Sequence, residues 1–285
     1  MTNRKTNYLQ EISLHYKEHA RGTSWFTEHE ALNQVLFSEM HHCNKSVMNF
    51  FVVGEITFPF FSMGTIDTNK LFGINEIILF FFYFINRKKY KKVLDLGANV
   101  GLHTLIMKKL GFEVISYEPD EIQQNQFKKV MDLNGFDTSF LKAKAVSDKS
   151  GRMKYLRILD NTTGSHLLGS KEDVYGPTDI VSVEVDDILE VVIEGDFNFI
   201  KMDVEGHEAV LLNRITTESL NHTDVMLEIG SKNNSNAIFD IFKKKGIPAY
   251  AQKINWERVK NLEDLPSHHT HGSVFLSMRG APKWS

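Results

Sequence analysis

The sequence predicts an α/β protein built around a doubly wound, mostly parallel sheet. From residue 70 onward, apolar runs of strand length alternate with helical patterns. The stretch "VLDLGANVGLHTL", residues 93–105, passes from an apolar run through a glycine-bearing turn into an apolar helical pattern. The chain has 285 residues, of which 42% are hydrophobic and 24% are charged, so it can bury a sizeable core.

A different pattern precedes residue 70, and it predicts an N-terminal cap. Residues 4–20 and 28–40 have helical patterns. The runs "MNFFVV" and "EITFPFF", split at a glycine-glutamate pair, predict a β-hairpin. We therefore expect two parts, a cap over residues 1–70 and a second domain over residues 71–285.

The most apolar stretch, 77–85, predicts a buried helix rather than a membrane span. It is far shorter than the ~20 apolar residues that a spanning helix needs. A basic run follows it and directly precedes the first strand of the second domain. Ligands of open α/β sheets bind beyond the carboxyl ends of the strands, so we expect this run in a solvated connection on the opposite rim. The run consists of Arg87, Lys88, Lys89, Lys91 and Lys92.

The remaining elements follow from the alternation of patterns along the chain. An antiparallel pair of strands, with a polar loop between them, interrupts the alternation as an insertion over 148–185. The predicted strands are 92–96, 113–117, 140–146, 197–204, 224–230 and 272–278. The predicted helices are 101–110, 121–134, 186–192, 207–215 and 235–246.

Composition excludes some classes of partner and compartment. The formal net charge is -3 and the pI is near 6.5, so no overall basic field favours nucleic acid. The only cysteine, Cys43, rules out an intramolecular disulfide and fits a reducing compartment. The polar start of the chain lacks the apolar core of a secretory signal, which predicts a cytoplasmic protein without a membrane partner.

The glycine-bearing turn is spaced as Asp95-x-Gly97-x-x-x-Gly101. A dinucleotide fingerprint needs G-x-G-x-x-G, and Asn99 and Leu102 stand where that pattern requires glycine, so NAD is not expected. Gly97 lets the chain leave the strand sharply, Gly101 allows close approach of a ligand to the helix start, and Asp95 can accept from an ammonium group. A tight strand-to-helix turn without a ligand is the alternative.

Glu118 lies in "YEPD", at the carboxyl end of the next predicted strand. Dinucleotide enzymes place an acidic residue here, about 20 residues beyond the glycines, where it binds the ribose hydroxyls. The alternatives are a surface carboxylate or a charge that stabilises the start of the following helix. The two motifs together predict a ribose-containing ligand without a pyrophosphate.

These residues resemble a known family. The segments "VLDLGANVGLHTL", "YEPD", "AVSD" and "IKMDVEGHE" are similar to S-adenosylmethionine-dependent methyltransferases of the FkbM type, over roughly residues 70–278. The resemblance implies a class I methyltransferase fold, in which a seven-stranded sheet has an antiparallel last strand. It also implies O-methylation of a hydroxyl on a sugar, glycoside or other small metabolite.

The resemblance implies roles for particular positions. Glu118, with Pro119 beside it, corresponds to the ribose site, Asp203 lies next to the methyl group, and Glu76 approaches the methionine end. The adenine is flanked by Ala145, Val146, Ser147 and Asp148. The methionine part is surrounded by Asp95, Gly97, Ala98, Asn99 and Gly101.

Transfer to a hydroxyl needs a base. Asp203, Glu205 and His207 lie at and just beyond the end of one predicted strand. His271 precedes the last strand together with two further histidines in "PSHHTHGSVFL", on the same rim if that strand is antiparallel. A histidine, with an ordinary pKa of about 6.5, is slightly favoured over Asp203 as the base.

Each of these side chains has an alternative role. Glu205 can serve as a helix-terminal charge, and the histidines can be exposed loop residues. The spacing H-H-x-H is not a specific metal signature, so no metal is predicted. The alternative functions are a non-catalytic S-adenosylmethionine-binding module and, with less support, a nucleic-acid methyltransferase, because "DVEG" lacks the proline-aromatic turn of base-flipping enzymes.

Overall fold

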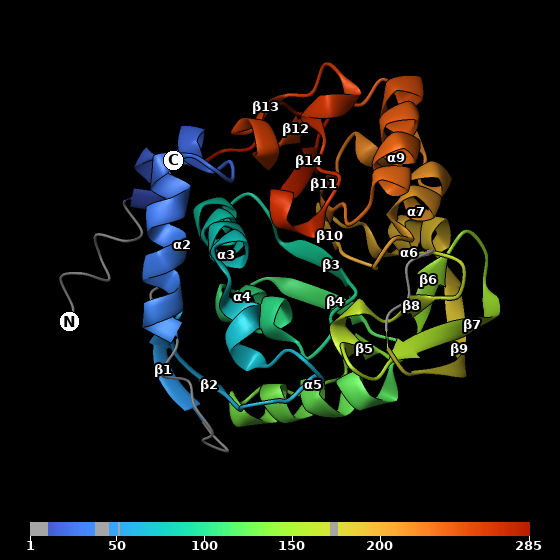
Figure 1. Ribbon diagram of the computed structural model, residues 1–285. Helices are drawn as coiled ribbons and strands as arrows, with labels where there is room; N and C mark the ends of the chain where they lie inside the picture. Colours follow the sequence, from blue (N-terminus) through green and yellow to red (C-terminus); the bar gives the residue numbers. More distant parts are fainter. Residues whose placement is uncertain (1–10, 38–45, 51, 172–175) are drawn as a thin grey trace.

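The protein is described by a computed structural model over residues 11–37, 46–50, 52–171 and 176–285 (Figure 1). Within these residues the central sheet has eight strands in the order β13-β12-β14-β11-β10-β3-β4-β5. They are β3 (Lys92–Leu96), β4 (Glu113–Tyr117), β5 (Leu141–Lys142), β10 (Phe199–Met202), β11 (Asp224–Glu228), β12 (Ala249–Ala251), β13 (Glu257–Arg258) and β14 (Ser273–Leu276).

The strand directions confirm the predicted doubly wound sheet. Strands β5, β4, β3, β10 and β11 pair in parallel, whereas β14 runs antiparallel to both of its neighbours, β11 and β12. Seven of the strands match the seven that the family resemblance implies. The eighth, β13, is a two-residue addition at the edge, and the sequence pattern predicted neither it nor β12.

Helices cover both faces of the sheet (Figure 1). Alternate residues of a strand point to opposite faces, so Val93 joins the hydrophobic cluster under α3, α4 and α5, while Leu94 joins the cluster under α6, α7 and α9. The helices are α3 (Ile74–Asn86), α4 (Leu102–Lys109), α5 (Glu121–Leu133), α6 (Ile188–Gly195), α7 (Glu208–Arg214), α8 (Thr217–Leu220) and α9 (Lys232–Lys245).

The strand predicted over 140–146 is wrong as a single element. The chain forms β5 in the central sheet and then β6 (Ala145–Ser147), which belongs to a second sheet in the order β6-β9-β7-β8. That sheet holds β7 (Gly151–Ile158), β8 (His166–Leu167) and β9 (Thr178–Asp187). The long antiparallel β7–β9 ladder confirms the predicted inserted pair, and β9 continues to Asp187 because its last residues pair with β6.

The described part of the cap contains a helical segment over 11–14, helix α2 (Ser24–Phe37), and strands β1 (Ser46–Phe50) and β2 (Gly54–Phe58). The two strands pair antiparallel, which confirms the hairpin. Helix α2 begins four residues earlier than predicted, whereas the predicted helical residues 4–10 and 38–40 lie outside the described residues, as does Cys43. The short 3-10 turns are Tyr16–Glu18, Thr68–Phe72, Thr162–Gly164, Gln252–Ile254, Leu262–Asp264 and His269–His271.

The cap is bonded to the C-terminal part of the chain, which lies beside α2 in Figure 1. The Trp256 indole N–H donates to Nδ1 of the buried His19 at 3.1 Å, and the Gln252 amide donates to the His19 carbonyl at 3.1 Å. The Ser13 hydroxyl donates to the Trp284 carbonyl at 2.6 Å. The cap side chains therefore share one hydrophobic cluster with the sheet, and the division of the chain near residue 70 stays a prediction.

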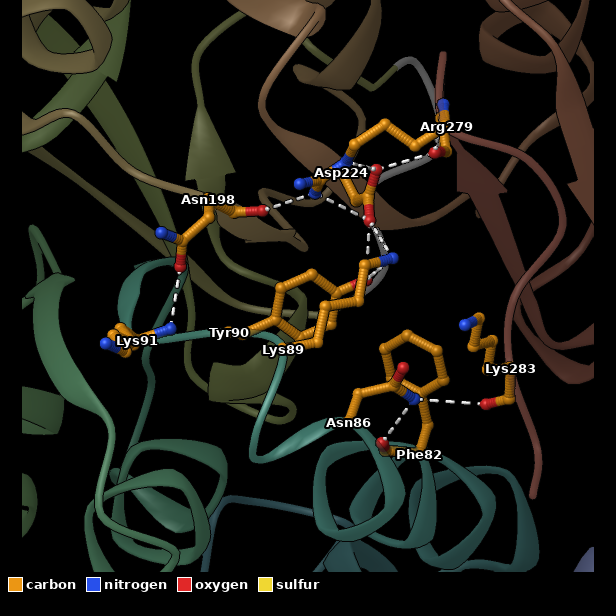
Figure 2. A network of polar contacts seen from close by, with 10 residues as sticks. Phe82, Asn86, Lys89, Tyr90, Lys91, Asn198, Asp224, Arg279 and Lys283 are labelled. Atoms are coloured by element: carbon orange, nitrogen blue, oxygen red, sulfur yellow. Dashed lines mark hydrogen bonds and ion pairs between the residues drawn. The ribbon is translucent and has the colours of Figure 1, made fainter.

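The basic run before β3 is more than a solvated connection. At the rim formed by the amino end of β11, Lys89 lies 2.7 Å and Arg279 2.8 Å from the buried carboxylate of Asp224 (Figure 2). The Tyr90 and Ser277 hydroxyls also donate to this carboxylate. Burial raises the pKa of Asp224, but these hydrogen bonds outweigh burial and leave the pKa below its usual value. This part of the run is thus a structural anchor.

The apolar stretch at 77–85 lies inside α3, whose side chains are mostly buried against the sheet and cap. Among the described residues, no helix is both long enough and apolar enough to cross a bilayer.

Candidate active site

A cavity of about 510 Å³ lies beyond the carboxyl ends of β3, β4, β10 and β11. Its wall combines the turns after these strands with residues of the inserted segment. The predicted site residues in the wall are Glu76, Gly97, Ala98, Asn99, Glu118, Pro119, Ala145, Val146, Asp203, Glu205 and His207. Asp95, Gly101 and His271 lie outside the described wall. The structure therefore brings together most of the predicted residues, which come from five separate segments of the chain.

Gly97 makes the turn after β3 possible. Its φ is +76°, and a Cβ atom there would lie 1.8 Å from the backbone oxygen of Asp203. The N–H groups of Gly97 and Ala98 both donate to the carbonyl of Tyr117 at the end of β4, at 3.1 and 3.0 Å. The turn is thus held between β4 and β10, where only a glycine allows the backbones to come this close.

Asp95 and Gly101 lie behind the described wall, and the ligand contacts predicted for them stay predictions. The Asp95 carboxylate is buried, accepts from the Thr104 hydroxyl at 2.6 Å and lies 3.6 Å from Nζ of Lys201. A Cβ atom on Gly101 would lie 2.7 Å from the ring of Phe127 in α5. The close approach that Gly101 permits in the structure is therefore one between α4 and α5.

Lys201 is a wall residue that the sequence analysis missed. Its buried ammonium group lies 3.3 Å from a carboxylate oxygen of Asp203 and donates to the Gly97 carbonyl at 3.2 Å. Burial lowers the pKa of Lys201, but the charges of Asp203 and Asp95 outweigh burial and raise the pKa overall. A lysine inside the apolar run "FNFIKMDV" is the signal that could have found it, because a buried ammonium needs a carboxylate partner.

Glu118 has the arrangement expected of a ribose-binding carboxylate. It is 4% exposed, and its two oxygens accept from the N–H groups of Asn99 and Asp120, each at 2.8 Å. Each oxygen keeps lone-pair capacity for one further hydroxyl. Burial raises the pKa of Glu118 to about 7 against the effect of these bonds. The residue that caps α5 is Asp120, so the alternative helix-terminal role belongs to Asp120 and not to Glu118.

The predicted adenine residues divide into two pairs. Ala145 and Val146 line the cavity, together with the rings of Tyr117 and Tyr155. Ser147 is buried, and its hydroxyl lies 2.9 Å from Nε2 of His207, while Asp148 lies outside the described wall. Only the first pair is in a position to contact a ligand in the cavity directly.

His207 is not a solvated turn residue. Its Nε2 and Nδ1 lie 2.9 and 3.0 Å from the hydroxyls of Ser147 and Ser170, and the side chain is buried. Burial lowers its pKa, with a smaller opposite effect from Asp148. Because both ring nitrogens already have hydroxyl partners, His207 connects the inserted segment to β6 and is poorly placed to take a proton from a ligand.

We call the part of the cavity beside the carboxyl ends of β10 and β11 its inner end. The carboxylates there differ in exposure and in their partners. Asp203, 32% exposed, is bonded to Lys201. Glu205 forms an ion pair with Lys171. Glu228, which lines the same end, has a pKa raised well above its usual value by burial and by the neighbouring carboxylates of Asp203 and Glu76.

Glu76 lies in the wall where the resemblance implies it. Its carboxylate is 2.8 Å from Nε2 of His103, and Nδ1 of the same ring is 2.9 Å from the buried Tyr83 hydroxyl. The sequence analysis missed His103, which also lines the cavity. Its position on α4 opposite α3 becomes visible only in three dimensions.

The histidines before β14 lie on the predicted rim, since β14 runs antiparallel to β11. His269 lines the cavity, whereas His271 accepts from the Ser267 N–H at 3.4 Å and His268 caps the turn by accepting from the Thr270 N–H at 3.3 Å. Burial lowers the pKa of both His269 and His271. In the described parts of the chain, no group of three or more His, Cys, Asp and Glu side chains is arranged to hold a metal ion.

Comparison with known proteins gives one family match. A family model described as the methyltransferase FkbM domain matches residues 95–245. No curated protein matches the sequence.

Several solved structures are similar to the chain at low identity. A ribosomal protein L11 methylase from Lactobacillus delbrueckii subsp. bulgaricus has 11% identity over 69% of this chain and 75% of that chain, with a TM-score of 0.38. A SAM-dependent methyltransferase from Agrobacterium tumefaciens has 10% identity over 82% and 70%, with a TM-score of 0.40. A Pyrococcus abyssi tRNA (uracil-54, C5)-methyltransferase has 12% identity over 82% and 44%, with a TM-score of 0.38.

Proposed function

The chain belongs to the FkbM methyltransferase family, and from this premise we propose that it transfers a methyl group to a hydroxyl of a sugar, glycoside or other small metabolite. The observation that carries the proposal is the inner end of the cavity, where Asp203 presents a partly exposed carboxylate beside the buried ammonium group of Lys201. A positioned carboxylate can take the proton that a hydroxyl must lose when its oxygen is methylated.

The residues of the cavity fit S-adenosylmethionine, the methyl donor of this family. Glu118 keeps acceptor capacity for the ribose hydroxyls, Ala145 and Val146 offer an apolar surface to the adenine, and the Gly97 turn forms the wall beside the methionine part. When bound, the donor supplies a methyl group on a positively charged sulfur. This sulfur is a good leaving group, because it departs as a neutral thioether. The acidic side chains Glu76 and Asp203 favour a cation at this end.

The chain's own residues then orient the acceptor and handle its proton. Alignment of the acceptor hydroxyl can contribute several kcal/mol to the rate. We assign proton removal to Asp203 rather than to the histidine that sequence reasoning slightly favoured, because His207 is bonded on both ring nitrogens and His271 is outside the wall. Lys201 fixes the Asp203 carboxylate, and Glu205 is already paired with Lys171.

A turnover screen tests the proposed function. The purified protein, incubated with S-adenosylmethionine and a panel of sugars and glycosides, should form S-adenosylhomocysteine together with a methylated acceptor identified by mass spectrometry. Binding of both cofactor forms, with no binding of NAD, should be seen by calorimetry. Cofactor binding without transfer to any hydroxylated acceptor would favour a non-catalytic binding module. Transfer to nucleic acid alone would contradict the small-molecule acceptor.

Substitution of Glu118 tests the cofactor site. Glu118→Gln should weaken S-adenosylhomocysteine binding by about 10- to 100-fold, since hydrogen bonds to charged groups contribute roughly 1.5 to 3 kcal/mol. The wild-type affinity should rise with pH through about 7, where this carboxyl group ionises, and the variant should lose that dependence. In the free protein, the raised pKa of Glu118 adds to the free energy of unfolding at low pH. This contribution is complete below about pH 4.3, the ordinary pKa of a glutamate, and is lost as pH rises through about 7, the pKa in the folded protein.

The matched control is Glu121→Gln, at an exposed position in the first turn of α5. It should leave both the affinity and its pH dependence unchanged. Equal affinities of wild type and Glu118→Gln at pH 8 would show that Glu118 does not bind the ribose.

A further inference from the structure

A buried ion pair joins the inserted sheet to the turn that follows β4. Arg157, on β7, donates from Nε to one carboxylate oxygen of Asp120 at 2.8 Å and from Nη2 to the other at 2.7 Å. The Asp120 side chain is fully buried, and that of Arg157 is 14% exposed. A guanidinium that binds both oxygens of a carboxylate fixes the direction of the carboxylate as well as its distance. The ion pair therefore sets the position of Asp120 relative to the inserted sheet.

Asp120 also contacts the ribose-binding carboxylate proposed above, through its backbone. Its N–H group donates to Oε1 of Glu118 at 2.8 Å. Its Oδ1 atom, which accepts from Arg157, also accepts from the Ile122 N–H at 2.9 Å, at the start of α5. One short turn thus connects the guanidinium of Arg157, the start of α5 and the carboxylate of Glu118. A displacement of Asp120 must therefore move a group that orients Glu118.

Arg157 belongs to a different sheet from the strand that leads to Glu118. Its strand, β7, pairs with β8 and β9 in the second sheet, whereas β4 lies in the central sheet. The exposed residue Asp179 is the partner of Arg157 in the β7–β9 register, yet the guanidinium binds the buried carboxylate of Asp120. The ion pair therefore connects the two sheets at the turn that carries Glu118.

The charge of Asp120 acts on Glu118 as well. Burial raises the pKa of Glu118, the two N–H groups bonded to it lower the pKa, the charge of Asp120 raises it and the charge of Lys201 lowers it. The Tyr155 phenol lies in the same wall, and because burial raises its pKa well above the usual value it stays neutral. Since Arg157 lies beside Asp120, its positive charge offsets the negative charge that acts on Glu118.

We propose that Arg157 is a positioning residue for cofactor binding, which holds Asp120 so that the Asp120 N–H group directs the carboxylate of Glu118 toward the ribose. The proposal rests on the proposed function, in which Glu118 binds the ribose hydroxyls. Arg157 and Asp120 both lie outside the described cavity wall, so the effect of Arg157 reaches the ligand through Glu118. The inserted sheet thereby becomes a part of the cofactor site.

The first test is Arg157→Met, which keeps much of the apolar length of the side chain and removes its charge. S-adenosylhomocysteine binding, measured by calorimetry, should be about tenfold weaker at about pH 9, which corresponds to the loss of one hydrogen bond. The rise of affinity with pH should also occur at higher pH than in the wild type, because the charge of Asp120 is no longer offset. A loss of packing alone would weaken binding without moving this pH dependence.

Two further variants separate the charge of Arg157 from its geometry. Arg157→Lys keeps the charge but not the contact with both carboxylate oxygens, so affinity should fall while the pH dependence stays near that of the wild type. The double variant Arg157→Met/Asp120→Asn contains no unpaired charge at this place, so it tests the proposal even if Arg157→Met does not fold. Its binding should again be about tenfold weaker at about pH 9. Its pH dependence should move to lower pH, because the charge of Asp120 is gone.

The matched control is Arg152→Met, which makes the same chemical change on the same strand. Arg152 is exposed, and its Nε donates to the Ser182 hydroxyl on β9 at 3.3 Å. The control should leave the affinity and its pH dependence unchanged. If it had the same effects as Arg157→Met, a disturbance of β7 and not the contact with Asp120 would be the cause, and the inference would be wrong.

The outcomes separate the inference from the proposed function. Absence of S-adenosylhomocysteine binding to the wild type would contradict the methyltransferase function itself. Normal affinity of Glu118→Gln would remove the ribose role on which the inference rests, and the inference with it. If Glu118→Gln behaves as expected but the double variant binds like the wild type at every pH, Arg157 has no positioning role. Weaker binding with an unchanged pH dependence in both Arg157→Met and the double variant would show a structural role alone and would also overturn the inference.

Discussion

Gly97→Ala is expected to abolish S-adenosylhomocysteine binding and to lower the free energy of unfolding by about 3 kcal/mol or more. The added methyl group would lie 1.8 Å from the Asp203 backbone oxygen, so either the turn after β3 or the end of β10 must move. Both segments line the cavity, and their displacement changes the cofactor site and the base together. Calorimetry and denaturant unfolding measure the two effects.

Gly135→Ala is the matched control. Its φ of +77° is nearly the same as the +76° of Gly97, but a Cβ atom there has no neighbour within 4 Å. It should show only the backbone cost of a left-handed alanine, roughly 1 kcal/mol, and normal cofactor binding. If the two variants were equally stable and both bound the cofactor, the close approach of β3 and β10 would not be a requirement of the site.

Asp203→Asn should reduce turnover by about 10²-fold or more while cofactor affinity changes only a few-fold. The amide keeps the shape of the carboxylate but cannot accept the hydroxyl proton, and a lost general base usually costs this much. Rates measured at saturating cofactor separate this effect from binding. Asp240→Asn, at an exposed position on α9, is the control that should retain normal turnover.

The histidine alternative is tested in the same series. Alanine substitutions at His207, His268, His269 and His271 should each leave turnover within about tenfold of the wild type if Asp203 is the base. If one histidine variant lost as much activity as is expected for Asp203→Asn, and its pH profile also lost the acidic limb, that histidine would be the general base. Asp203 would then be left with a part in orienting the substrates.

The sequence could predict those parts of the fold that depend on local patterns. Strands β3 and β4 were predicted residue for residue because each is an apolar run between clear breaks. The stretch 140–146 failed because its division between two sheets depends on the pairing of β6 with β9, forty residues later in the chain. No local pattern encodes a partner at that distance.

The same distinction applies to the site. Carboxylates such as Glu118 and Asp203 could be predicted because strand ends meet on one rim of a parallel sheet. Lys201 and His103 could not, because their importance comes from partners in other elements. Nor can a sequence show that the ring of Phe127 packs beside the Cα atom of Gly101.

The contacts between the cap and the C-terminal part of the chain have a consequence for biosynthesis. His19 is bonded to Gln252 and Trp256, which follow it by 233 and 237 residues. At roughly 5 to 20 residues per second, a ribosome takes on the order of 10 to 50 s to make that length of chain. During this interval the hydrophobic cluster that contains Trp25 and Phe26 lacks its late members Trp256, Phe275 and Trp284, so the nascent cap exposes apolar surface to which chaperones can bind.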